Sequence, residues 1–189
     1  SLININVIAA CKEAKVKKIL AFTSVCAFPN GLELLEESKL HDGPPHPAHE
    51  SYAYAKRMVD VQLRAYKKQY GLDSCCLIPG NMFGENDNYN LEDGHVVPSL
   101  IHKFYEAKIR NEPVQIWGDG SSYREFLYAK DVAKICIELL EKPELPQRLI
   151  ISGSKEYTIK DIVTMISDIF RYHNIDYDKS KPNGQLKRP

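Results

Sequence analysis

The sequence lacks a surplus of charge of either sign, because its 189 residues carry 25 lysines and arginines against 25 aspartates and glutamates. A chain with no net charge and a pI near 7.0 offers no bulk electrostatic attraction for nucleic acid or an anionic membrane. Long hydrophobic runs are also missing, since the longest, Val7–Cys11, is far too short to span a bilayer. The N-terminal segment carries its charges late, which is the reverse of a secretory signal. With 43% hydrophobic residues the chain can still build a core, so we expect a soluble globular protein of the cytoplasm.

Paired cysteines and metal-ligand spacings are absent as well. The five cysteines form no C-x-x-C motif, no N-x-[ST] sequon occurs, and the six histidines are scattered. This pattern is typical of a reducing compartment, and we expect no metal site. Cys75 and Cys76 lie in an apolar run where neighbouring side chains point to opposite faces, so we expect both to be buried.

The glycine turn G-x-G-x-x-G, which holds the pyrophosphate of a dinucleotide at a helix N-terminus, is also missing. The nearest match, Gly118-x-Gly120-x-x-Tyr123, lacks the third glycine and precedes no expected helix. The chain moreover opens with a helical pattern instead of a strand. We therefore expect either that the protein binds no dinucleotide or that the first half of such a fold lies outside this sequence.

An alternation of helical and strand-like segments is present throughout. Apolar periodicity predicts helices at 2–15, 51–70, 97–107, 130–141 and 159–172, and strands at 18–24, 74–79, 114–117 and 148–151. Gly71 is the expected cap of the second helix, and Thr158-x-x-Asp161 is a variant capping box for the last. Strands that alternate with helices indicate an α/β protein with a mainly parallel sheet. The long loop at 80–94 is a candidate site, because loops of that length are usually functional.

Tyr52 and Lys56 stand four residues apart on the helix expected at 51–70, so their side chains share one face. A phenol is a poor acid at neutral pH, but an adjacent cation favours its ionisation. Such a pair can give a proton to a carbonyl oxygen that receives a hydride, while Ser24 at the end of the preceding strand holds that oxygen. A second match, Tyr177 with Lys181, means that the spacing alone also fits an ordinary surface helix.

Five longer motifs carry a more specific signal: TSVCAFP, SYAYAKRMVD, IPGNMFGENDNYNLEDGHVVPSLI, VQIWGDGSSYREFLY and SKPNGQ. On these motifs the whole chain resembles the extended short-chain dehydrogenase/reductase family. The resemblance implies a Rossmann-like, doubly wound, mainly parallel sheet, of which this chain holds the second part, with a smaller α/β substrate-binding domain. It places the cofactor domain mainly at 1–95, with return segments near 114–150, and the substrate domain mainly at 96–189. It implies further that the glycine-turn portion and the C-terminal end are missing.

The same resemblance implies 3,5-epimerisation and NADPH-dependent 4-reduction of GDP-4-keto-6-deoxy-D-mannose. A C4 ketone acidifies the protons on C3 and C5, so that chemistry needs a base, an acid and a holder for the oxygen. By matching, Cys26 is the base and His95 the acid, while Tyr52, Lys56 and Ser24 serve the reduction. On spacing alone, Cys26 is more often buried filler and His95 a structural loop residue.

The remaining residues that match are implied to bind ligands. The cofactor side is formed by Phe22, Thr23, Ser24, Val25, Tyr52, Lys56, Pro79, Gly80, Asn81, Met82 and His95. The GDP-sugar side is formed by Lys103, Trp117, Arg124 and Asn183, although Asn183 replaces an aspartate that many members have. A buried core role is the alternative for Trp117.

Two other functions remain open at this point. One is a different nucleotide-sugar epimerase or dehydratase on the same fold, against which the combination of Cys26 with His95 argues. The other is a non-catalytic Rossmann-like binding module, which the missing glycine turn supports. Relatives pair as homodimers through a four-helix interface, so the resemblance implies a homodimer through the helices at 2–15 and 51–70.

Overall fold

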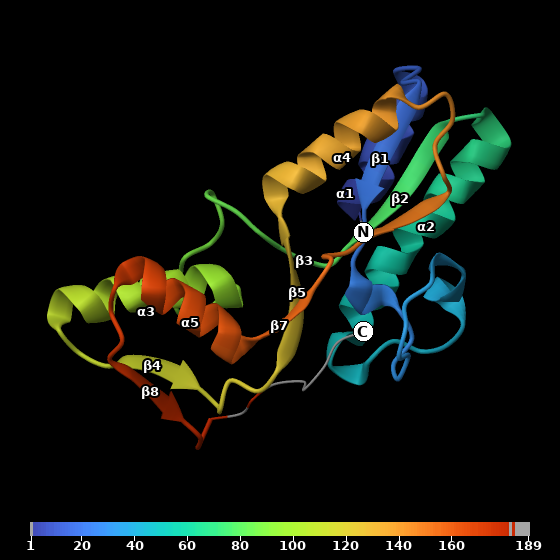
Figure 1. The fold of residues 1–189 in the computed structure, drawn as a ribbon. Helices are drawn as coiled ribbons and strands as arrows, with labels where there is room; N and C mark the ends of the chain where they lie inside the picture. Colours follow the sequence, from blue (N-terminus) through green and yellow to red (C-terminus); the bar gives the residue numbers. More distant parts are fainter. Residues whose placement is uncertain (1, 182, 184–189) are drawn as a thin grey trace. The chain divides into compact units, whose positions relative to one another are not determined.

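The computed structural model describes residues 2–181 and 183, and these form an α/β fold (Figure 1). The chain divides into two compact units that interleave along the sequence. The first unit consists of residues up to 80 together with 130–152, and the second of 81–129 together with residues from 153 onward. Each unit has its own hydrophobic core, so each is described separately.

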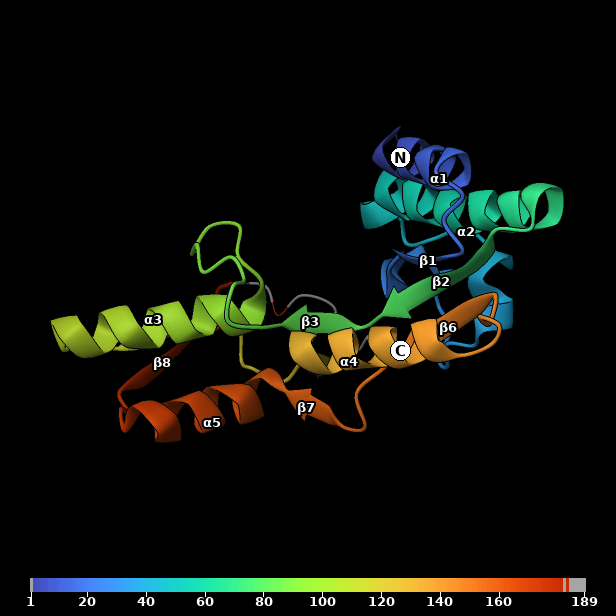
Figure 2. The ribbon, with the colours of Figure 1, turned by 90° about the horizontal axis from the view of Figure 1, so that it is seen from above.

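The first unit is a parallel sheet with helices on both faces. Its strands are β1 (Lys18–Phe22), β2 (Asp73–Pro79) and β6 (Arg148–Ile151), in the order β1-β2-β6. Figure 2 shows α1 (Leu2–Glu13) and α2 (Glu50–Tyr70) on one side of this sheet and α4 (Ala129–Glu141) on the other. Right-handed crossover connections place helices on both faces of such sheets, which buries the strands between them.

Two apolar clusters hold this unit together. The first packs α1 and α2 against the sheet through Ile8, Ile19, Val59, Leu63, Leu72 and Cys76. The second lies under the segment that joins β1 to α2 and contains Ala27, Phe28, Leu40 and Ile78. That segment carries three short 3-10 helices, η1 (Val25–Ala27), η2 (Glu37–His41) and η3 (Pro47–His49). The turn that follows β1 is therefore packed against buried apolar side chains.

The second unit contains two small sheets. One has the order β3-β5-β7, formed by β3 (Asn81–Phe83), β5 (Tyr123–Tyr128) and β7 (Glu156–Thr158), and the other pairs β4 (Val114–Trp117) with β8 (Ile175–Asp178). The helices α3 (Val96–Arg110) and α5 (Ile159–Phe170) pack on each other and on β4 around the fully buried Phe104 and Val163.

The expected element types are confirmed, and so is the α/β class. Gly71 adopts a left-handed φ of 68° and its N–H donates to the Lys67 carbonyl, as expected for the α2 cap. Thr158 and Asp161 form the expected capping box, with reciprocal backbone bonds of 3.0 and 2.9 Å. Cys75 and Cys76 are fully buried, and burial raises the pKa of both thiols to about 12.

Four strands were not expected from the sequence: β3, β5, β7 and β8. The sequence pattern assigns no element type to the segment of β5. β3 and β7 have three residues each, which is too short for an alternating pattern to stand out, and β8 contains two aspartates in four residues. The segment expected to be loop from residue 80 thus begins with a strand. The mainly parallel arrangement is confirmed, with the β5–β7 pair antiparallel. Among the described residues, no helix is both long and apolar enough to cross a membrane.

Candidate active site

The turn after β1 places Ser24 and Cys26 at the carboxyl end of a parallel strand. Ser24 has extended backbone angles and caps η1, because its Oγ accepts a hydrogen bond from the Cys26 N–H at 3.2 Å. Cys26 is half-buried at the centre of this 3-10 turn. Ligands of open α/β sheets bind outside the carboxyl ends of the strands, so both side chains stand where a ligand is expected.

The helix α2 brings Tyr52 and Lys56 to the same strand end. The Lys56 Nζ donates to the Phe22 carbonyl at 3.3 Å and lies 5.7 Å from the centroid of the Tyr52 ring. The Thr23 Oγ1 donates to the Lys56 carbonyl at 3.1 Å, so side chain and backbone of Lys56 are both tied to the end of β1. Tyr52 is 49% exposed, which leaves its ring accessible to a ligand. One unit thus gathers four of the five expected catalytic residues.

The competing Tyr177/Lys181 match does not form a helical pair. Tyr177 lies in β8, and Lys181 follows that strand with its Nζ 5.9 Å from the centroid of the Trp117 ring. Burial raises the pKa of Tyr177, which moves it away from acid chemistry at neutral pH. The geometry therefore favours Tyr52 with Lys56.

The end of β2 supplies the next group of expected cofactor residues. Pro79 ends the strand, and the Gly80 N–H donates to the Ile151 carbonyl at 2.9 Å in the first unit. Asn81 and Met82 begin β3 in the second unit, where the Asn81 amide donates to the Glu125 carbonyl at 3.0 Å and Met82 is 41% exposed.

The residues at the end of β1 fit the nicotinamide and ribose half of a dinucleotide. A lysine ammonium has three donors, and the Phe22 carbonyl takes one from Lys56, which leaves donors for a ribose hydroxyl. The half-exposed Phe22 ring adds an apolar surface for a flat ring. No cluster of histidine, cysteine, aspartate and glutamate within 2–181 and 183 could hold a metal ion.

His95 lies in the second unit, at the N-cap position of α3. Its side chain is 82% exposed, and its Nδ1 lies 3.9 Å from the Asp87 Oδ1. The loop before it is closed by a bond of 3.0 Å from the Gly94 N–H to the Asn90 carbonyl. A Cβ on Gly94 would come within 2.3 Å of that carbonyl oxygen, so the turn into His95 requires glycine.

The second unit also brings Lys103 to Trp117. The Lys103 Nζ donates to the Gln115 carbonyl at 3.0 Å and lies 5.2 Å from the centroid of the Trp117 ring, and burial lowers the pKa of Lys103. Trp117 is 59% exposed, which excludes the buried core role considered for it. Lys181 approaches the same ring, and sequence reasoning missed it although it lies in the motif SKPNGQ. Two lysines therefore flank an exposed aromatic face.

Arg124 and Asn183 are the remaining expected substrate residues. Arg124 lies in β5, and its Nη1 donates to the Tyr123 carbonyl at 2.6 Å. The Asn183 Oδ1 accepts from the Asp119 N–H at 2.7 Å, and its carbonyl accepts from the Ser122 hydroxyl at 2.7 Å. The amide of Asn183 thus holds the turn that follows Trp117.

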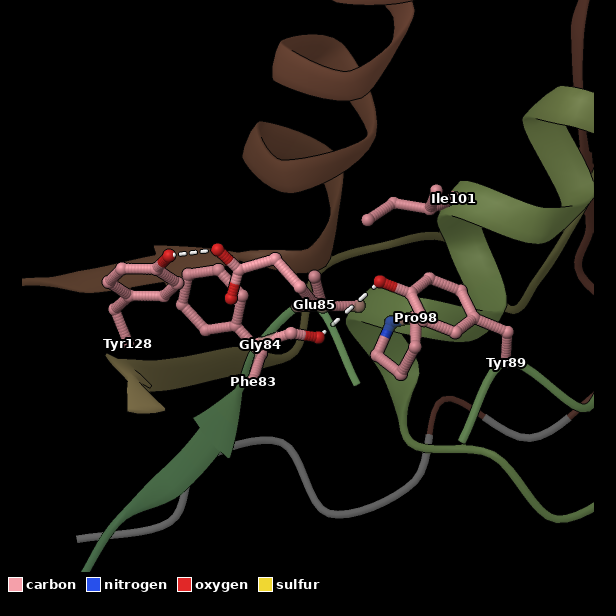
Figure 3. Close-up of a pocket in the computed structure, with 8 residues that line it drawn as sticks. Phe83, Gly84, Glu85, Tyr89, Pro98, Ile101 and Tyr128 are labelled. Carbon is pink, nitrogen blue, oxygen red and sulfur yellow. Dashed lines mark hydrogen bonds between the residues drawn. The ribbon is translucent and has the colours of Figure 1, made fainter. Parts of the chain in front are cut away.

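A separate cavity of about 280 Å³ lies in the second unit beside the 84–94 loop (Figure 3). Its walls are mainly aromatic and aliphatic, and the Tyr128 hydroxyl donates to the Glu85 carboxylate within it. It is lined by Phe83, Gly84, Glu85, Tyr89, Val97, Pro98, Ile101 and Tyr128. Phe83, Gly84, Glu85 and Tyr89 lie in the segment 80–94, which is a candidate site by its length, but none of the lining residues was assigned a role there from the sequence. The volume is at the small end of ligand pockets.

The NAD dependent epimerase/dehydratase family matches residues 1–152, and the chain belongs to this family. It is 42% identical over 190 residues to the GDP-L-fucose synthase of Dictyostelium discoideum, an alignment that covers 98% of this chain and 59% of that protein. The GDP-L-fucose synthase of Escherichia coli (strain K12) is 32% identical over 200 residues, which is 99% of this chain and 62% of the relative. The chain therefore spans about three fifths of the length of these relatives.

A solved structure has the same fold as the chain. The GDP-L-fucose synthetase from Naegleria fowleri bound to NADP superposes with a TM-score of 0.91 and 36% identity, over 98% of this chain and 60% of that one. The Rossmann-like fold expected from the sequence is thereby confirmed.

Proposed function

We propose that the chain carries the reaction centre of an enzyme that converts GDP-4-keto-6-deoxy-D-mannose to GDP-L-fucose with NADPH. The observation that carries this proposal is the gathering of Ser24, Cys26, Tyr52 and Lys56 at the carboxyl end of β1. Support comes from relatives named GDP-L-fucose synthase that align over 98% of the chain, and from the Naegleria fowleri protein, whose structure is bound to NADP.

In the proposed epimerisation, Cys26 acts as the base and His95 as the acid. The Cys26 thiolate takes the proton from C5, and the electron pair of that bond moves through C4 to the ketone oxygen. The hydroxyls of Ser24 and Tyr52 donate to this oxygen and stabilise its negative charge. His95 returns a proton to the opposite face of C5, and exchange with solvent resets both groups. The same sequence at C3 completes the double inversion.

In the proposed reduction, bound NADPH supplies a hydride to C4. Tyr52 transfers its phenolic proton to the C4 oxygen, so that the ketone becomes a hydroxyl. The Lys56 ammonium stabilises the phenolate left on Tyr52, and its remaining donors bind the ribose of the cofactor. Ser24 keeps the oxygen in place through both stages.

The GDP-sugar is proposed to bind in the second unit. The exposed Trp117 ring flanked by Lys103 and Lys181 offers an aromatic surface and two positive charges to a nucleoside diphosphate. The guanidinium of Arg124 adds a planar fork of donors that suits phosphate oxygens.

A homodimer through α1 and α2 is part of the proposal. Tyr54, Met58 and Val61 are each at least 40% exposed and lie at helical spacing along one side of α2. On α1, Leu2, Ile3 and Val7 are also exposed, the first two by more than 70%. An apolar surface of this kind is typical of an interface between protein subunits.

The test is to incubate the full-length protein with GDP-4-keto-6-deoxy-D-mannose and NADPH in deuterated water. We expect one NADPH to be oxidised for each GDP-L-fucose formed, with deuterium at C3 and C5 of the product by mass spectrometry and NMR. Reduction without deuterium would instead indicate a simple 4-reductase of the same family. Binding of neither NADPH nor the GDP-sugar would indicate a non-catalytic module.

A further inference from the structure

Arg57 is a buried arginine next to Lys56 on α2, and it contacts the turn that carries Cys26. Its side chain is 7% exposed, and its Nε donates to the carbonyl of Ala27 at 2.6 Å. Ala27 is the last residue of η1 and is fully buried. The guanidinium is therefore hydrogen-bonded to the last residue of the 3-10 turn whose central residue is Cys26.

Hydrogen bonds connect α2 to the segment 22–27 on both sides of Cys26. The Lys56–Phe22 and Thr23–Lys56 bonds hold the chain before Cys26. Of these bonds, the one from Arg57 to Ala27 holds the backbone that follows Cys26. The helix that carries Tyr52 and Lys56 thus also sets the position of the Cys26 turn.

Stability alone gives a poor account of an arginine at this position. The Arg57 Nη2 is buried and has no hydrogen-bond partner among the described residues, and burial lowers the pKa of the group. A buried donor without a partner is costly, whereas an apolar side chain of similar length would incur no such cost. The Tyr54 ring, 5.5 Å from the Arg57 Cζ, compensates only in part.

We propose that Arg57 is a positioning residue for Cys26, which acts by fixing the Ala27 carbonyl and so aiming the sulfur at the substrate C–H bonds. This inference rests on the proposed role of Cys26 as the base. The inference predicts different effects on the two stages of the reaction, because Tyr52 and Lys56 keep their own contacts when Arg57 is replaced. Proton abstraction then depends on Arg57, and hydride transfer does not.

The test compares Arg57→Met and Arg57→Lys with Arg64→Met, a matched change on the same helix at a partly exposed arginine that contacts Asp60 instead. One assay follows deuterium exchange at C3 and C5. A second follows NADPH oxidation with the epimerised ketone that the Tyr52→Phe protein accumulates, and a third follows the thermal midpoint. Because a displacement of about 1 Å can cost about 10²-fold in rate, we expect exchange by Arg57→Met to fall by about that factor.

Hydride transfer and the thermal midpoint of Arg57→Met are expected to stay close to those of the unchanged protein and of Arg64→Met. Arg57→Lys retains one donor and is expected to recover part of the exchange. Equal loss of exchange and hydride transfer in both Arg57 variants, or undiminished exchange in Arg57→Met, would overturn the inference. If the Arg57→Met protein fails to fold, the loss of exchange relative to hydride transfer in the Arg57→Lys protein tests the inference instead. Rapid exchange by the Cys26→Ser protein would refute the proposed role of Cys26 as the base. That result is distinguishable from one that refutes only the positioning role of Arg57.

Discussion

Ser24 and Cys26 share one 3-10 turn, yet they contribute different chemistry to the proposed reaction. The serine hydroxyl is a hydrogen-bond donor and acceptor, and it also caps the turn. Only the sulfur can act as a base, since a thiolate forms far more readily near neutral pH than an alkoxide. Substitution at position 26 therefore tests proton abstraction with little change to the turn.

We expect Cys26→Ser to abolish exchange of the C3 and C5 protons with solvent. The hydroxyl is close to the thiol in size, but it does not ionise at neutral pH. The measurement is NMR of GDP-4-keto-6-deoxy-D-mannose in deuterated water with the full-length variant. Cys11→Ser, on the half-buried face of α1, is the control for general loss of a thiol.

We expect Tyr52→Phe to block reduction and to leave exchange at C3 and C5 at least partly intact. The phenylalanine keeps the ring and the contact with Lys56 but has no proton for the C4 oxygen. A positioned general acid usually contributes about 10²–10⁴-fold, so NADPH oxidation should fall by that factor. The measurement is the loss of NADPH absorbance beside the exchange assay. Unchanged oxidation of NADPH would contradict the assignment.

Sequence reasoning could locate Tyr52 and Lys56 because a helix converts a spacing of four into proximity. It could not locate Arg57 in the same way. A single arginine in a helix usually lies in solvent, and only the folded chain shows that Ala27 lies beneath it. The turn-forming role of Asn183 was missed for the same reason, since its partners Asp119 and Ser122 are distant in the sequence.

At the scale of elements, Asp60 joins α2 to β6 and η2. Its carboxylate is fully buried and accepts hydrogen bonds from Arg148 at 2.7 and 2.9 Å, from Arg64 at 3.0 Å and from His41 at 2.8 Å. Burial opposes ionisation, but the hydrogen bonds of Arg148 and His41 and the charges of both arginines outweigh it. The pKa of Asp60 is consequently lowered.

A lowered pKa makes the stability from Asp60 dependent on pH. The contribution is complete above the unfolded pKa of about 4 and is lost as the pH falls through the lower folded value. Because breaking one side of a buried ion pair costs about 3–5 kcal/mol, we expect Asp60→Asn to lower the free energy of unfolding by about that amount at pH 7. The deficit should shrink as the pH falls from about 5 towards 2.

Urea denaturation of Asp60→Asn and of the unchanged protein at several pH values measures this difference. Arg64→Met is the control, because it removes one partly exposed partner and leaves Arg148 in place. Its effect should be smaller than that of Asp60→Asn, because Arg64 is partly exposed and Asp60 keeps its two hydrogen bonds from Arg148. A constant gap between Asp60→Asn and the unchanged protein at all pH values would contradict the lowered pKa.

Elements with local signals were predictable, and elements that depend on distant partners were not. The α2 helix ends at Tyr70 because Gly71 adopts a left-handed φ, and α5 begins after the capping box of Thr158. β8 has no such signal. Its residues become a strand because they pair with β4, in the register Ile175 to Val114. Tertiary pairing overrides weak strand propensity there.

At the scale of the whole molecule, the exposed apolar side of α2 is part of the proposed interface between two copies of the chain. We expect Val61→Lys, alone or with Met58→Glu, to convert the proposed homodimer into monomers, because a buried unpaired charge at an interface is costly. Sedimentation equilibrium or light scattering measures the mass. Lys134→Glu, on the exposed surface of α4, is the control and should leave the mass unchanged. A dimer that survives both changes would place the interface elsewhere.

The interleaving of the two units has a consequence for synthesis on the ribosome. The edge of β2 is completed by β6, with Pro79 opposite Ile151, so β2 leaves the ribosome long before its partner exists. All of the second unit up to Ala129 is translated in that interval. A strand edge exposed for so long invites pairing with other nascent chains. Codon usage and chaperone binding over 81–147 should therefore affect the yield of folded protein more than changes after Ile151.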